Sequence, residues 1–395
     1  MQNFNLHVIA LSMNKLADGL LNPKLVLAWL LTTLGAGSVW VGLLVPVREA
    51  GALLPQLFIA EPVRRMTIRK WAWVVGGILQ GLAALGIAAA AIWLQGAMAG
   101  MVIVGFVAVL AVARSLSSVS YKDVLGKTVV KTVRGRVSGT AASIAAVGVF
   151  LFGSLLLFGV IERFILVVAA LAVAGALWIV AGMVFALLQE EPSTPVVEQG
   201  ENVWRRYIAY LKNDTELQRL IIARSLLLAT AIAPPYLLLL SDQVAGGTVG
   251  QIGMLVLASS LATMVSGRVW GVMSDRSTPA VLVYSGVIAG VVLVGAVVAA
   301  QAGYFTNSLV LPGLLFVLLV AYQGVRIART THLVNIANEN TRAGYTAISN
   351  TIVGVALLMT GALGALVPFL GISAVVGILA VMSFAGAVVA RQLTP

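Results

Sequence analysis

Ionisable side chains interrupt apolar stretches of this sequence that are long enough to cross a membrane. Lys15 and Asp18 lie three residues apart, so they share one face of a helix. They stand about 9 to 12 residues into the first stretch, which at roughly 1.5 Å per residue places them near the middle of a bilayer. Arg48 and Glu49 lie about as deep in the second stretch, counted from the other side. We therefore expect these four groups to meet at a similar depth.

A fifth charged residue, Arg224, enters the seventh apolar stretch and completes the set. Each such group costs at least about 2.5 to 3.5 kcal/mol in a span, so it usually faces a cavity or a partner. Asp18 or Glu49 could bind and release a proton, which would couple solute movement to a proton gradient. The cations could instead bind an anionic solute, with Arg48 holding a carboxylate through two hydrogen bonds. A third interpretation is that these groups form buried ion pairs that only fix helix packing.

The elements that must position these residues are membrane helices. Of the 395 residues 60% are hydrophobic and 10% are charged, whereas soluble domains have about a quarter charged residues. Apolar runs of about 20 residues predict an all-α polytopic membrane protein. The twelve expected spans are Leu6–Leu34, Val39–Ala60, Trp71–Leu94, Met98–Ser118, Val137–Val160, Phe164–Leu188, Leu217–Leu240, Val249–Gly271, Ala280–Ala302, Leu309–Val325, Ala343–Leu366 and Ile372–Val389.

A polar stretch divides these spans into two groups of six. We expect an N-terminal bundle over 1–188, a linker over 189–216 and a C-terminal bundle over 217–395, with an amphipathic surface helix at Trp204–Arg219. Lysine and arginine concentrate in the linker and in the loops after the second, fourth and tenth spans. By the positive-inside rule, these loops and both termini are cytoplasmic. The expected location is a bacterial inner membrane.

Composition also argues against several classes of function. The sequence has no cysteine, two distant histidines and no phosphate-binding loop of the Walker type, so neither a metal site, a cofactor nor ATP-driven pumping is expected. No catalytic cluster stands within the spans, which argues against an enzyme. The net charge of +11 lies in loops between spans, so it indicates membrane topology and not nucleic-acid binding. The expected partners are a small solute, protons and the lipid bilayer, and we expect a monomer.

Prolines and polar residues mark further positions in the spans. Pro234 and Pro235 should break or kink the seventh span, and Pro23 the first. These are the first spans of each half, and matching broken helices often border a transport site. The tenth span ends in polar residues that could line a cytoplasmic mouth: Tyr322, Gln323 and Arg326. For Arg329 and His332, just beyond, we favour an interfacial anchor.

One loop resembles a known family. Gly271, Asp275 and Arg276 stand as Gly-x-x-x-Asp-Arg after the eighth span, and the equivalent loop of the first half keeps only the basic pair Arg69 and Lys70. This pattern resembles the gating loop motif of the major facilitator superfamily of transporters. The resemblance implies two six-helix halves around a central cavity. Arg114 resembles the arginine that this family places in its fourth helix and that is often linked to proton coupling.

These observations favour a secondary transporter of a small organic solute that works by alternating access. We expect proton coupling and, from the excess of arginine and lysine within the spans, a slight preference for an anion. Helix 5 lacks the Gly-Pro pair of the family's antiporters, which argues against drug export, although export of a drug or metabolite stays open. A transporter-like sensor, lipid-handling or assembly protein without solute flux is the alternative from another class.

Overall fold

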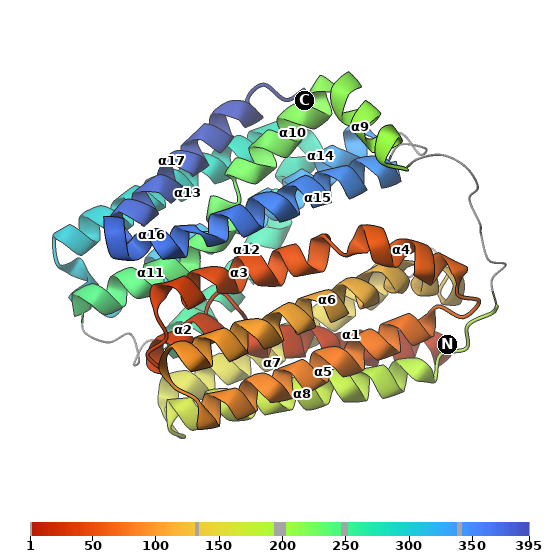
Figure 1. Cartoon of the computed structure of the whole chain (residues 1–395), viewed down its shortest axis with the longest axis horizontal. Coiled ribbons are helices and arrows are strands. Elements are labelled where there is room, and N and C mark those ends of the chain that lie inside the picture. Colours follow the sequence, from red (N-terminus) through yellow and green to blue (C-terminus); the bar gives the residue numbers. More distant parts are fainter. Residues whose placement is uncertain (1, 131–133, 193–202, 246–251, 338–341, 395) are drawn as a thin grey trace. The chain divides into compact units, whose positions relative to one another are not determined.

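The chain folds into helices that group in two compact units (Figure 1). The computed structural model describes residues 2–130, 134–192, 203–245, 252–337 and 342–394. The first unit comprises Met1–Trp40 and Val47–Gln199, and the second comprises Val41–Pro46 and Gly200–Pro395. Part of the expected linker, residues 193–202, lies outside the described residues. Each unit is treated below on its own.

The first unit contains long helices separated by short turns. The first expected span is divided into two helices, and so is the second, whereas the next four are continuous. The helices are α1 (Gln2–Leu21), α2 (Val26–Thr33), α3 (Ser38–Leu53), α4 (Gln56–Arg65), α5 (Lys70–Trp93), α6 (Gly96–Thr128), α7 (Arg134–Phe158) and α8 (Arg163–Ala186). Residues Val41–Pro46 of α3 belong to the second unit. Helix α6 runs ten residues past the predicted end of its span at Ser118, so the polar residues 119–128 are also helical.

The second unit begins with a short amphipathic helix and continues with long apolar ones. Its helices are α9 (Val203–Asn213), α10 (Thr215–Leu226), α11 (Ala229–Ala245), α12 (Ile252–Arg276), α13 (Thr278–Gln301), α14 (Val310–Ile336), α15 (Arg342–Gly361), α16 (Leu363–Leu370) and α17 (Ile372–Ala390). The surface helix predicted at Trp204–Arg219 is therefore two elements. Asp214 separates them, since its carboxylate accepts a hydrogen bond from the Leu217 amide and caps α10 at 3.0 Å.

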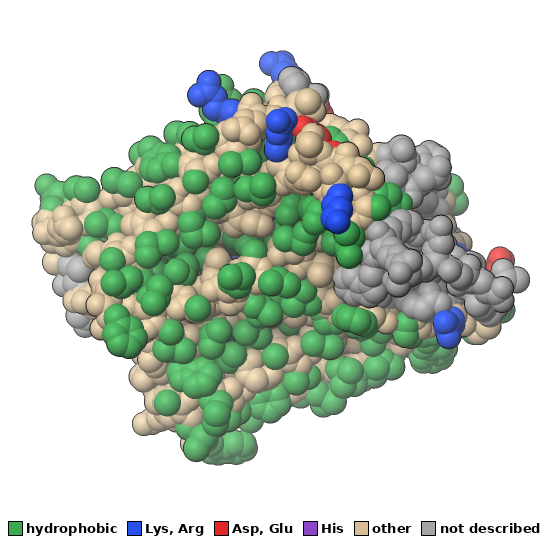
Figure 2. All heavy atoms as spheres, turned by 45° about the horizontal axis from the view of Figure 1, so that its top comes forward, with side chains coloured by type: hydrophobic (Ala, Val, Ile, Leu, Met, Phe, Trp, Pro, Cys, Tyr) green, Lys and Arg blue, Asp and Glu red, His purple; other side chains and the backbone are tan. Residues whose placement is uncertain are grey.

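Apolar side chains on the outside of the helices show that the chain is built for a membrane. Ten helical segments of the described chain are long and apolar enough to cross a bilayer. Large hydrophobic side chains stand exposed on them, such as Trp93 at 77%, Met359 at 72% and Phe369 at 84%. Figure 2 shows hydrophobic side chains spread over one face of the protein, with few charged groups among them. The chain is an integral membrane protein.

Helix packing in the first unit depends on close backbone approach. Helix α5 contacts α6 and α8, and α1 contacts α7 and α8. On the α5 face toward α8, a Cβ added to Gly81 would lie 2.6 Å from the Gly175 carbonyl oxygen, and one added to Gly77 would lie 3.3 Å from that of Trp178. Such glycines let membrane helices approach closely. Gly77 and Gly81 therefore allow α5 to pack closely against α8.

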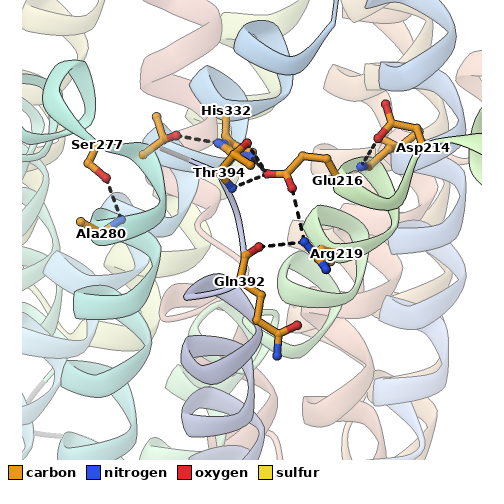
Figure 3. A network of polar contacts seen from close by, with 10 residues as sticks. Asp214, Glu216, Arg219, Ser277, Ala280, His332, Gln392 and Thr394 are labelled. Atoms are coloured by element: carbon orange, nitrogen blue, oxygen red, sulfur yellow. Dashed lines mark hydrogen bonds and ion pairs between the residues drawn. The ribbon is translucent and has the colours of Figure 1, made fainter.

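A polar network holds one end of the second unit together (Figure 3). Glu216 on α10 accepts hydrogen bonds from the Thr394 amide and hydroxyl at 2.7 and 2.9 Å, and its carboxylate lies 3.1 Å from His332 Nε2 on α14. The other ring nitrogen of His332 lies 2.7 Å from the Thr278 hydroxyl at the start of α13. The network therefore connects α10, α13, α14 and the segment after α17. His332, which we expected to be an interfacial anchor, is buried in it.

Two predicted helix breaks have different outcomes. The break expected at Pro23 is present, since α1 ends at Leu21 and α2 begins at Val26. Pro234 and Pro235, expected to break or kink the seventh span, both lie inside α11, and the interruption of this span falls earlier, at Leu227 and Leu228. A proline cannot donate to the carbonyl four residues before it and crowds the preceding turn. That turn is tightened instead, with the Ala231 amide bonded to the Leu228 carbonyl at 2.8 Å.

Candidate functional site

The candidate site of the first unit is centred on the carboxylate of Asp18. Arg48 Nη2 on α3 donates to Asp18 Oδ1 at 2.9 Å, and Arg114 Nη1 on α6 donates to Asp18 Oδ2. Three helices that are distant in sequence thus converge on one carboxylate. The Arg48 side chain is 8% exposed, whereas those of Asp18 and Arg114 are 23% and 35% exposed. Arg48 is therefore the buried partner, and Arg114 is the partner with access to an opening.

Two further charges act on this triad. Lys15, one turn before Asp18 on α1, lies close enough to stabilise the ionised carboxylate. Glu49 is close enough to stabilise the positive charges of Arg48 and Arg114. The cluster holds three cations and two anions, so it has a single excess positive charge. Asp18 thus bonds to arginines of two other helices, whereas the sequence alone left open which of the buried charges pair.

A cavity of about 190 Å³ opens beside the cluster. Lys15 and Arg114 bring charge to its wall. The remaining lining residues are largely polar or aromatic and come from α1, α5 and α6: Leu11, Asn14, Trp73, Gln80, Ser117, Ser118 and Tyr121. The wall thus offers two cationic donors, amide groups and hydroxyls. Such a wall can bind a small polar solute carrying at least one negative group.

Gln80 is the least expected member of the cavity wall. Its side chain is 1% exposed, and Nε2 donates to the Gly76 carbonyl at 3.1 Å and to the Ser117 hydroxyl at 3.3 Å. Its buried Oε1 accepts no hydrogen bond within the described structure. A buried acceptor left unused costs free energy unless a donor reaches it. Gln80 thus brings an unused hydrogen-bond acceptor to the lining of the cavity.

The neighbouring amide, Asn14, is held in place. Its Oδ1 accepts a hydrogen bond of 2.8 Å from Trp178 Nε1 on α8. The sequence analysis predicted neither Asn14 nor Gln80 as a site residue. An amide in the middle of an apolar helix is the signal that could have found Gln80, because burying an amide is also costly.

Arg224 belongs to the second unit. It is 6% exposed on α10 and donates to the Ser349 hydroxyl and, at 3.2 Å, to Asn350 Oδ1, both on α15. Asp18 and the four charges around it lie in the first unit. The expectation that Arg224 completes their set stays a prediction.

The loop residues of the resemblance lie in two different settings. Arg69 Nη1 donates to Asp123 at 2.8 Å, and Lys70 Nζ donates to the carbonyls of Ala186 and Leu188 at the end of α8. Glu190 accepts from the backbone amides of Arg69 and Lys70 and from Lys127. In the second unit Asp275 and Arg276 are exposed at the end of α12, and Gly271 is half-buried one turn earlier. The basic pair of the first unit thus connects the start of α5 to α6 and to the end of α8.

The polar residues of the tenth predicted span lie along α14. Gln323 donates to the Thr263 hydroxyl on α12 at 3.2 Å. Tyr322 is half-buried and Arg326 is exposed. Their place at a cytoplasmic mouth stays a prediction. Among the residues that the structure describes, no three His, Asp or Glu side chains gather as metal ligands.

Comparison with known proteins bears on the fold. No sequence-family profile and no curated protein sequence matches the chain. Among solved structures, the nucleoside transporter NupG matches with a TM-score of 0.76 over 100% of both chains at 13% identity. A POT family transporter in complex with 5-aminolevulinic acid matches with a TM-score of 0.75 over 99% of this chain and 96% of that chain, at 10% identity.

A D-xylose-proton symporter matches with a TM-score of 0.69 over 100% of this chain and 98% of that chain, at 11% identity. The chain has the major facilitator fold. The resemblance seen at Gly271, Asp275 and Arg276 is therefore confirmed at the level of the fold. Identities of 10 to 13% carry neither substrate nor mechanism from these proteins to this one.

Proposed function

We propose that this protein is a secondary transporter that carries a small organic anion by alternating access, coupled to protons. The observation that carries the proposal is the Asp18 carboxylate, shared by Arg48 and Arg114 beside a polar cavity. Its support is the fold, which the chain shares with transporters of nucleosides and with a sugar-proton symporter. Charged groups kept within a membrane bundle are functional by default.

Arg114 connects the cluster to the solute. It lines the cavity, is about a third exposed and bonds to Asp18, so an anionic solute competes with Asp18 for the same guanidinium. Protonation of Asp18 removes its negative charge and releases Arg114 toward the cavity. Binding of the anion and of a proton then favour one another. A proton on Asp18 frees Arg114 for the anion, and an anion on Arg114 makes Asp18 easier to protonate. This linkage is the minimal device for proton-coupled uptake of an anion.

Twelve spans and two six-helix halves are part of the same proposal. Ten segments meet the requirement for length and apolarity. The α1–α2 and α3–α4 pairs supply the other two, and they carry Lys15, Asp18, Arg48 and Glu49. The charges that make these segments less apolar are thus the charges of the candidate site. The basic junction at Arg69 and Lys70 is assigned to the cytoplasm with both termini, and the membrane to the bacterial inner membrane.

The direct test is solute uptake into proteoliposomes under an imposed pH gradient, with a panel of organic anions and neutral sugars. The proposal expects accumulation of an anion, driven by the gradient and abolished in Asp18→Asn. Glu162→Gln is the control, because Glu162 is exposed at the N-terminus of α8 and only caps that helix. Flux unaffected by the pH gradient would remove proton coupling. Absence of flux across the panel would favour a transporter-like protein without transport.

A further inference from the structure

The second unit contains a buried arginine that makes no ion pair with any carboxylate of the described residues. Arg224 is 6% exposed, and its side chain donates to two neutral oxygens, those of Ser349 and Asn350. Its Nε is buried and bonds to no acceptor among the described residues. A guanidinium has five N–H donors, so much of its hydrogen-bonding capacity is unused here.

A second cation makes this burial more costly. Arg329 on α14 is close enough that its positive charge repels that of Arg224. Arg329 is half-buried, and its side chain makes no hydrogen bond or ion pair with any described residue. Helices α10, α14 and α15 contact one another, so both guanidinium groups lie within one three-helix cluster.

The acidic residues of α10 do not compensate the pair. Asp214 accepts from the Leu217 amide and from the Tyr345 hydroxyl at 2.6 Å. Glu216 is engaged by Thr394, His332 and Arg219 (Figure 3). Both carboxylates are held at the start of α10, two turns or more before Arg224.

A buried charge without a counter-ion is strongly destabilising, and a like charge nearby adds to the cost. Proteins keep such an arrangement where an anion completes it, because guanidinium groups bind carboxylates and phosphates through paired hydrogen bonds. Ser349 and Asn350 orient one edge of Arg224 and leave Nε for another acceptor.

We propose that Arg224 and Arg329 form an oxyanion site within the second unit, which takes a carboxylate or phosphate group. Its residues belong to the second unit, whereas those of the Asp18 cluster belong to the first. This proposal rests on the proposed function, because the transported solute is the natural source of the anion. Arg224 supplies the buried donors, and Arg329 supplies a second charge from α14. Arg329 is thereby assigned to binding, whereas its sequence position suggested an interfacial anchor.

The site is tested by binding, without any transport measurement. The purified full-length protein in detergent is titrated with inorganic phosphate, sulfate and succinate, and with glucose as a neutral probe, at constant ionic strength. Thermal unfolding and calorimetry report affinity, since a ligand of the folded state raises its stability. The expected result is stabilisation by at least one oxyanion and none by glucose. The three anions separate a carboxylate site from a phosphate or sulfate site.

Variants assign the binding to these residues. Arg224→Gln is expected to weaken the anion about tenfold or more, as the loss of one charge-assisted hydrogen bond does. Arg329→Gln should weaken it by a smaller factor. Arg391→Gln is the matched control, because Arg391 is exposed at the end of α17 in the same unit. Without anion, Arg224→Gln should melt at or above the wild-type temperature, since it removes an uncompensated charge.

Three outcomes would overturn the proposal: no anion stabilises the wild type, Arg224→Gln and Arg329→Gln keep its affinity, or Arg224→Gln melts well below it without anion. The last would make Arg224 a structural donor to α15. Failure of Arg224→Gln to fold would count as this last outcome, and Arg329→Gln reports on anion binding independently. Uptake of an organic anion that Arg224→Gln and Arg329→Gln leave unchanged would refute this site and leave the transporter proposal intact.

Discussion

Asp18 on α1 is joined to Arg48 on α3 by a hydrogen-bonded ion pair of 2.9 Å. Since the Arg48 side chain is 8% exposed, removing the carboxylate leaves a buried cation without its main partner. We expect Asp18→Asn to lower the free energy of unfolding by roughly 1.5 to 3 kcal/mol, the range for a hydrogen bond to a charged group. Unfolding in mixed micelles by a denaturing detergent measures this change. The double variant Asp18→Asn with Arg48→Gln should lose less than the sum of the single variants.

Arg48 and Arg114 should differ in what they contribute, although both bind Asp18. Arg114 lines the cavity and is 35% exposed, whereas Arg48 is buried. Arg114→Gln is therefore expected to abolish anion uptake with little loss of stability, and Arg48→Gln to destabilise the protein. Uptake and thermal unfolding are measured on both variants. Equal effects on stability would show that Arg114 is a packing residue.

The Gln80 side chain permits a test of the cavity in which stability and binding move apart. Leucine has nearly the same size and removes a buried acceptor that has no donor in the described structure. We expect Gln80→Leu to leave thermal stability unchanged or higher, while the KM for the solute rises about tenfold, as for one lost hydrogen bond of about 1.4 kcal/mol. An unchanged KM would place the solute away from α5.

Close packing of α5 on α8 can be tested at a single glycine. A Cβ at position 81 would meet the Gly175 carbonyl oxygen at 2.6 Å, and backbone cannot move aside cheaply. Gly81→Val should cost about 1 to 3 kcal/mol of unfolding free energy through overpacking. Gly105→Val on α6 is the control, because a Cβ there meets no atom within 4 Å. Similar losses in both variants would indicate an effect of valine itself.

The network at Glu216 should hold the end of the chain in place. Glu216→Gln keeps the size of the side chain but removes the charge that Thr394, His332 and Arg219 approach (Figure 3). We expect faster hydrogen exchange of the Thr394 amide and faster trimming by carboxypeptidase. Glu191→Gln, an exposed position in the first unit, serves as control. Unchanged exchange at Thr394 would contradict the role of this carboxylate.

Much of the fold follows from the sequence, because hydropathy and helix length are local properties. Ten expected spans appear as long apolar helices or helix pairs. Counting residues from the membrane surface placed Asp18 and Arg48 at one depth, and the structure joins them. The prolines did not locate the break in the seventh span, since both lie inside α11 and the break falls earlier, at Leu227 and Leu228.

The parts that escaped sequence reasoning depend on which helices become neighbours. Depth alone cannot tell that Asp18 pairs with Arg114 in addition to Arg48, or that Gln80 on α5 borders the same cavity as Lys15. The approach of Arg329 to Arg224 likewise needs the packing of α14 on α10. Arg114 was reached only through a family resemblance, which carries the packing of related helices implicitly.

The interruption between α1 and α2 has a mechanical consequence for the cluster four residues away. The Asp18 carbonyl accepts the Asn22 amide at 3.1 Å, and the Asn22 carbonyl then accepts the amides of Leu25, Val26 and Leu27. One carbonyl oxygen thus fastens the buried helix α2 to the helix that bears the charges. The Asn22 side chain adds a further bond, because its Oδ1 accepts the Lys24 amide at 3.1 Å. The first predicted span is thus interrupted directly after the residue on which the charge cluster is centred.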